Sequence, residues 1–70
     1  LARLEISKQG KLKNTCVDDI ENQHKVSITI VIKNGERVFH PRGNEILNPG
    51  DTMVFLAETN QIQQVIRLNR

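Results

Sequence analysis

The stretch Val26 to Leu56, VSITIVIKNGERVFHPRGNEILNPGDTMVFL, decides the fold because it predicts three strands joined by two turns. Its first part has apolar residues at every second position, which is typical of a strand with one buried face. The positions on that predicted buried face are Val26, Ile28, Ile30 and Ile32. Asn34-Gly35 follows, and both residue types tolerate positive φ, so the pattern indicates a hairpin with a two-residue turn.

Such a turn also fixes the register of the hairpin. From the turn outward it pairs Lys33 with Glu36, Ile32 with Arg37, Val31 with Val38 and Ile30 with Phe39. The second connection leaves the hairpin through Pro41 and regains apolar residues at Ile46-Leu47. Pro49-Gly50-Asp51 then predicts a tight turn into a strand over residues 52 to 57, in which Asp51 has a structural role because Asp bonds to nearby backbone in such turns.

Outside this stretch the pattern predicts one more strand and two helices. Leu1 to Ser7 alternates like a short strand, which we expect beside the hairpin. Thr15 predicts an N-cap, with Asp18 at N3 of a helix that ends near His24. The apolar stripe of that helix would contain Cys16, Val17 and Ile20. A second cap within residues 58 to 60 and helical spacing through Gln61 to Asn69 indicate the second helix.

The predicted fold class is therefore α+β, in the order β-α-β-β-β-α, with one mostly antiparallel sheet of about four strands and two helices. Seventy residues make one domain, residues 1–70, and a chain of this length buries only about 60% of its extended surface. We therefore expect a homodimer. Because the chain begins at Leu1 rather than Met, we also expect it to be a fragment of a longer protein.

Composition limits the classes of function. The net charge is +2, but the ten basic and eight acidic residues are interspersed and only two residues are aromatic, which counts against nucleic-acid binding. No apolar run is long enough to span a bilayer. The single cysteine, Cys16, excludes an internal disulfide and fits the cytoplasm.

No catalytic or metal site is predicted. Neither His24 nor His40 has a Cys or carboxylate partner at the spacing of a metal site. Asp18 and Asp19 are explained by the positive end of a helix, and Cys16 has no basic neighbour that would form a thiolate. The sequence thus favours a protein that is not an enzyme.

Taken in order, these features resemble the TrkA-C domain, also called the RCK C-terminal domain. The opening signature is a polar loop followed by an apolar-spaced capped helix, here Leu12-Lys13-Asn14-Thr15-Cys16-Val17-Asp18-Asp19-Ile20. The closing signature is an isoleucine-rich strand, a Gly-containing turn, a strand that ends in proline, and an apolar residue before Gly-Asp and a last strand. Its counterparts are Ile28-Thr29-Ile30-Val31-Ile32, Asn34-Gly35, His40-Pro41, Ile46-Leu47-Asn48-Pro49-Gly50-Asp51 and Met53-Val54-Phe55-Leu56.

The resemblance implies a dimeric regulatory module, the cytoplasmic domain of a bacterial inner-membrane channel or transporter for cations such as potassium or for anions. Two alternatives stay open: a passive dimerisation domain without a small ligand, and the sensor domain of a transcription regulator. Because family members bind cyclic di-AMP between two subunits, the resemblance implies this or another adenine nucleotide as the ligand and assigns no other cofactor.

Ligand contacts are also implied by position. Val17 and Ile20 would be the apolar contacts from the helix, and Pro41 the contact from the proline segment. Nucleotide-binding members carry an Arg near the end of the helix and an Asn at the start of the strand. Those places hold Asn22 or Gln23 and Ser27 or Ile28 here. His40 beside Pro41 is our preferred polar contact, and Arg42 is a candidate to receive a phosphate.

Overall fold

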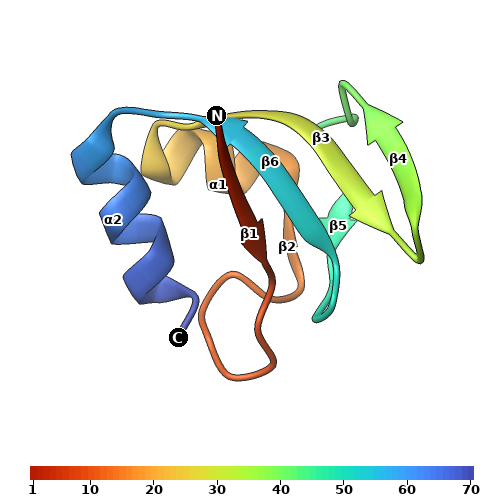
Figure 1. Cartoon of the computed structure of the whole chain (residues 1–70), viewed down its shortest axis with the longest axis horizontal. Helices are drawn as coiled ribbons and strands as arrows, with labels where there is room; N and C mark the ends of the chain where they lie inside the picture. The colour runs from red at the N-terminus through yellow and green to blue at the C-terminus, as the bar shows by residue number, and fades with distance from the viewer.

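The computed structural model describes every residue of the chain, Leu1–Arg70. Along the sequence the elements are β1 (Ala2–Glu5), β2 (Thr15–Cys16), α1 (Val17–His24), β3 (Ser27–Lys33), β4 (Glu36–Phe39), β5 (Ile46–Leu47), β6 (Thr52–Leu56) and α2 (Thr59–Leu68). Figure 1 shows the two helices beside the main sheet and the β3–β4 hairpin projecting away from them. Neither helix has the length and apolar character needed to cross a membrane.

The main sheet has four strands in the order β1-β6-β3-β4, and every neighbouring pair is antiparallel. This confirms the predicted α+β class with one antiparallel sheet and two helices. The expected position of the first strand was wrong, because β1 pairs with β6 at the edge opposite the hairpin. A second sheet, formed by β2 and β5, was not predicted; each of its strands is only two residues long.

The hairpin has the predicted register, from Lys33 opposite Glu36 to Ile30 opposite Phe39. Asn34 has φ of 51° and Gly35 has φ of 81°, as a two-residue turn between twisted strands requires. The length of the turn therefore determined every pair in the β3–β4 ladder.

The predicted buried face of β3 is correct only in its first half. Ile28 and Val31 face the core, at 6% and 0% exposed, whereas Ile30 and Ile32 face the other side of the sheet and are half-buried. The reason is a β-bulge at Thr29: Ile28 lies opposite Phe55 and Ile30 lies opposite Val54, so β3 carries one extra residue. After that extra residue, the odd-numbered positions of β3 face the core instead of the even-numbered ones.

One hydrophobic core of eleven residues lies between one face of the sheet and the helices. Its members are Ile6, Leu12, Val17, Ile20, Val26, Ile28, Val31, Leu47, Met53, Phe55 and Val65. Since α1, α2 and β5 all contribute to this cluster, they cover the same face of the sheet. The opposite face, which we call the outer face, carries Ile30, Ile32, Phe39, Val54 and Leu56 and has no element packed on it.

Helix α1 does not begin with the predicted side-chain cap. Cys16, rather than Thr15, is the N-cap residue and makes no side-chain cap bond, so it lies outside the helix instead of on its apolar stripe. The first N–H groups of the helix are satisfied by a loop: Val17 donates to the carbonyl of Glu45 and Asp18 to that of Gly43, both at 2.9 Å. Backbone carbonyls from residues distant in the sequence thus take the place of the predicted side-chain cap.

Helix α2 begins at Thr59, two residues before the predicted start, and its C-terminal end is fastened to the start of the chain. Asn69 is only 7% exposed; its amide nitrogen donates to the carbonyl of Glu5 at 2.7 Å, and its Oδ1 accepts the N–H of Ser7 at 3.0 Å. The Ser7 hydroxyl donates in turn to the carbonyl of Asn69. We call this set of contacts the terminal clasp.

Candidate functional site

The candidate site is built around an edge of β3 that has no neighbouring strand. Strand β4 ends at Phe39, opposite Ile30, and the last contact along this edge is the His40 N–H donating to the Thr29 carbonyl at 2.9 Å. Strand β3, however, starts two residues earlier, at Ser27. Residues 27–28 therefore form an open edge on the side away from β6, about 7 Å long at the usual rise of a strand.

A carboxylate satisfies one backbone group of this open edge. The N–H of Ile28 donates to Oε2 of Glu21 at 2.8 Å, and Glu21 lies in the last two turns of α1. No sequence motif singles out Glu21; the only signal is that a strand N–H without a neighbouring strand needs another acceptor. This contact holds the end of α1 against the start of β3.

The chain passes from α1 to the open edge through Lys25. This residue is in the left-handed conformation, with φ of 57° and ψ of 48°, and its N–H donates to the carbonyl of Glu21 at 3.0 Å. Asn22 and Gln23, in the preceding turn, are exposed. They therefore present two amide side chains to solvent just before the strand, without a protein partner for either.

On the other side of the open edge, the chain leaves the hairpin in a strained conformation. His40 has φ of 51° although it is not glycine and precedes Pro41, a position where helical conformations are disfavoured. His40 and Arg42 are exposed and Pro41 is half-buried. The loop is then anchored to α1 at Gly43, where any Cβ would overlap the Asp18 carboxylate.

Ser27 is the first residue of the open edge, and His40 is bonded to Thr29 where that edge ends, with Pro41 and Arg42 as the next residues along the chain. Val17 and Ile20, the apolar ligand contacts that the resemblance implies, have side chains that are 2% and 0% exposed and belong to the core. Ile28 is also buried, at 6% exposed, so that only its backbone edge is available. These three apolar residues support the site from inside.

Comparison with known families identifies the chain. The family profile described as the TrkA-C domain matches residues 1–70. The chain belongs to the TrkA-C family. TrkA-C is a family of regulatory domains, and a search of the curated proteins finds no relative of this member.

Several solved structures share the fold of this TrkA-C domain. The RCK_C domain dimer of S. agalactiae BusR in complex with c-di-AMP has a TM-score of 0.85 at 12% identity, over 96% of this chain and 91% of that one. The RCK C domain of the potassium transport protein KtrA, in complex with cyclic diadenosine monophosphate, has a TM-score of 0.80 at 18% identity, over 94% and 78%.

BusR in complex with its busAB-promotor DNA also matches, with a TM-score of 0.85 and 12% identity, over 96% of this chain but only 34% of that one. At identities this low, the likeness establishes the fold. It also shows that the same fold occurs as one part of a longer DNA-binding protein.

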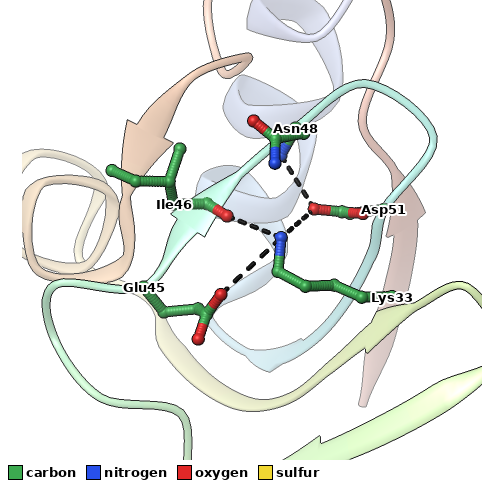
Figure 2. A network of polar contacts seen from close by, with 5 residues as sticks. All are labelled: Lys33, Glu45, Ile46, Asn48 and Asp51. Carbon is green, nitrogen blue, oxygen red and sulfur yellow. Dashed lines mark hydrogen bonds and ion pairs between the residues drawn. The ribbon is translucent and has the colours of Figure 1, made fainter.

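At the far end of β3, the TrkA-C domain contains a polar network centred on Lys33 (Figure 2). The Lys33 ammonium donates to the carbonyl of Ile46 at 2.7 Å and to Oδ2 of Asp51, and lies 3.7 Å from the carboxylate of Glu45. Oδ2 of Asp51 also accepts the N–H of Asn48 at 2.8 Å. The network joins β3 to β5 and to the turn before β6, in agreement with a structural role for Asp51.

A single TrkA-C domain has no closed pocket at the open edge. The one hollow in its surface, of about 330 Å³, lies on α2 between Gln63, Ile66, Arg67 and Arg70. No three His, Cys, Asp or Glu side chains are arranged to hold a metal ion.

Proposed function

We propose that this chain is a non-catalytic, ligand-sensing dimerisation module, which binds cyclic di-AMP or a related adenine nucleotide between two subunits and regulates ion transport. The observation that carries the proposal is the open edge of β3, which begins at Ser27 and ends at Thr29, whose carbonyl holds His40, the residue before Pro41 and Arg42. Ligand binding would favour one arrangement of the two subunits, and this preference would bias an attached or associated channel or transporter at the bacterial inner membrane.

The outer face of the sheet supports a dimer. Of its apolar side chains, Phe39 is 64% exposed and Leu56 is 51% exposed, and no other element covers them. Continuous apolar surface of this kind usually marks an interface. Ser27, opposite Leu56, lies at one end of the same face, so a partner on the outer face would approach the open edge.

The chemistry at the open edge fits a phosphate-bearing adenine nucleotide. Arg42 is exposed, makes no ion pair and is suited to phosphate. Pro41 offers an apolar surface to a base, and the exposed hydroxyl of Ser27 can bond to the edge of the base. Because cyclic di-AMP has two-fold symmetry, one molecule on the axis of a dimer would meet the same groups twice.

Two measurements test the proposal. Sedimentation of the isolated domain should give a dimer, and calorimetric titration should give one cyclic di-AMP per two chains. Arg42→Ala should weaken binding about tenfold through loss of a charge-assisted bond, whereas Arg67→Ala, an exposed arginine on α2, should leave it unchanged. Binding that is insensitive to Arg42, or a monomer at high concentration, would contradict the proposal.

The proposed dimer interface on the outer face can be tested with a matched pair of variants. Phe39→Arg puts a charge on the outer face and should produce monomers. Ile66→Arg changes an exposed apolar residue on α2 and should leave the dimer intact. A dimeric Phe39→Arg variant would place the interface elsewhere.

A second candidate function is the sensor domain of a transcription regulator, which the similarity to part of the DNA-bound BusR chain favours. The two functions share the ligand and the dimer and differ in what adjoins this domain. Sequencing of the full gene product decides between them: membrane-spanning segments or a dedicated transport partner would support transport, and a helix-turn-helix would support transcription. If no adenine nucleotide binds, passive dimerisation is the remaining function.

A further inference from the structure

The β-bulge in β3 lies at the boundary between the hairpin and the open edge. On the β6 side, the ladder pairs Ile28 with Phe55 and then Ile30 with Val54, which leaves Thr29 as the extra residue. On the β4 side, the ladder is regular and reaches back as far as Thr29, whose carbonyl accepts the His40 N–H at 2.9 Å. The two sides of one strand therefore differ in register at this residue.

Thr29 makes hydrogen bonds on both sides of β3. Its hydroxyl donates to the carbonyl of Val54 at 3.1 Å, a backbone acceptor on the neighbouring strand next to the irregularity. Its own carbonyl holds the first residue after β4. A bulge bends its strand and increases the local twist, and such bulges often aim a nearby side chain. Here the residue that is held is the strained His40.

We propose that Thr29 is a positioning residue of the ligand site: its bulge determines where β4 stops and thereby places His40 and Pro41 beside the open edge. Thr29 itself does not need to touch the ligand. The ligand part of this inference rests on the proposed function, whereas the placement of His40 is a property of the free protein. The two parts can be tested separately.

Deletion of Thr29 offers a clean test, because it removes the extra residue without turning any neighbour to the wrong face. Ile28 would still face the core and Ile30 the outer face, since they would become consecutive residues of a regular strand. The hairpin turn and the β4 residues are unchanged. Thr29→Val is the second variant, because it keeps the bulge and its shape but removes the hydroxyl that bonds to Val54.

The first readout needs no ligand. Amide hydrogen exchange and backbone chemical shifts of His40, measured by NMR, should change in the deletion variant, with faster exchange of the His40 N–H, while Val65 in the core part of α2 keeps its shifts. Thr29→Val should show the same change to a smaller degree, and decides the question if the deletion variant does not fold. Unchanged shifts and exchange at His40 in the folded variant would overturn the inference.

The second readout is affinity for cyclic di-AMP in calorimetry. We expect the deletion to weaken binding at least about tenfold while sedimentation still gives a dimer. A purely structural role would instead lower the unfolding midpoint and leave the affinity of the folded protein within twofold of the parent, and this outcome would overturn the inference. If the parent domain binds no adenine nucleotide, the proposed function fails, and the His40 measurements alone decide whether Thr29 positions the segment.

Discussion

The carboxylate of Glu21 accepts the N–H of Ile28 at 2.8 Å and thereby joins the end of α1 to the open edge of β3. A strand edge without a neighbour exposes backbone groups that invite pairing with other chains. Glu21 satisfies one of these groups and leaves the rest of the edge available. One side chain thus stabilises the helix-to-strand connection and limits how a partner can add to the sheet.

Replacement of Glu21 tests this contact. Glu21→Ala should lower the free energy of unfolding by about 1–2 kcal/mol, because the Ile28 N–H loses its acceptor. Glu21→Gln should lose less than half as much, because the amide oxygen can still accept the bond. Urea unfolding at one fixed protein concentration is the measurement, since a dimer's stability depends on concentration. Equal losses for both variants would refute the hydrogen-bond explanation.

The left-handed conformation of Lys25 predicts a stabilising substitution. With φ of 57° at the end of α1, Lys25 occupies a position that glycine adopts without steric cost. Lys25→Gly should raise the free energy of unfolding by about 0.5–1 kcal/mol. Lys8→Gly, at an exposed loop residue without positive φ, is the control and should not stabilise. Thermal unfolding distinguishes the two, and a destabilised Lys25→Gly would contradict this interpretation of the turn.

The network around Lys33 predicts coupled effects. Lys33→Met removes the ammonium group, leaves the Asp51 carboxylate poorly compensated at a mostly buried position, and should cost about 1–3 kcal/mol. Addition of Asp51→Asn should restore part of this loss, because the uncompensated charge is then gone. A double-mutant cycle by urea unfolding measures the coupling. Strictly additive losses would mean that the ammonium and the carboxylate do not depend on each other.

Gly10 is predicted to be irreplaceable for reasons of space. A Cβ there would overlap the backbone of Asn69, so Gly10→Ala forces the terminal clasp apart and should cost about 2–3 kcal/mol. Gly50→Ala is the control: its φ is 93° but its surroundings are open, so only backbone strain of about 1 kcal/mol is expected. Amide exchange at Asn69 should become fast only in the Gly10 variant. A protected Asn69 in that variant would argue against the overlap.

The hairpin could be predicted because its register depends on residues that are close together in the sequence. Asn34-Gly35 determines the loop length, and the loop length determines each pair up to Ile30 and Phe39. The bulge was not predictable in the same way, because Ile30 and Val31 are both β-branched apolar residues that suit either face of a strand. Whether Ile30 or Val31 is buried depends on how β3 pairs with β4 on one side and with β6 on the other.

The parts of the site that escaped prediction depend on contacts between distant residues. Thr15 looked like an N-cap, but the carbonyls of Glu45 and Gly43 satisfy the start of α1 and free Thr15 to pair with Leu47. Val17 and Ile20 match a family pattern of ligand contacts, and the structure adds that their side chains belong to the core. Sequence order placed these residues near the site without specifying which way their side chains face.

The terminal clasp has a consequence for synthesis on the ribosome. It joins residues 62 and 64 positions apart, Ser7 and Glu5 with Asn69, and the pairing of β1 with β6 spans almost as much of the chain. A nascent domain therefore cannot close its first strand against its last helix until Asn69 has left the exit tunnel. Contacts of such long separation form slowly, and the outer face stays accessible meanwhile. We expect chaperone binding during translation to end only once the last residues of the domain have emerged.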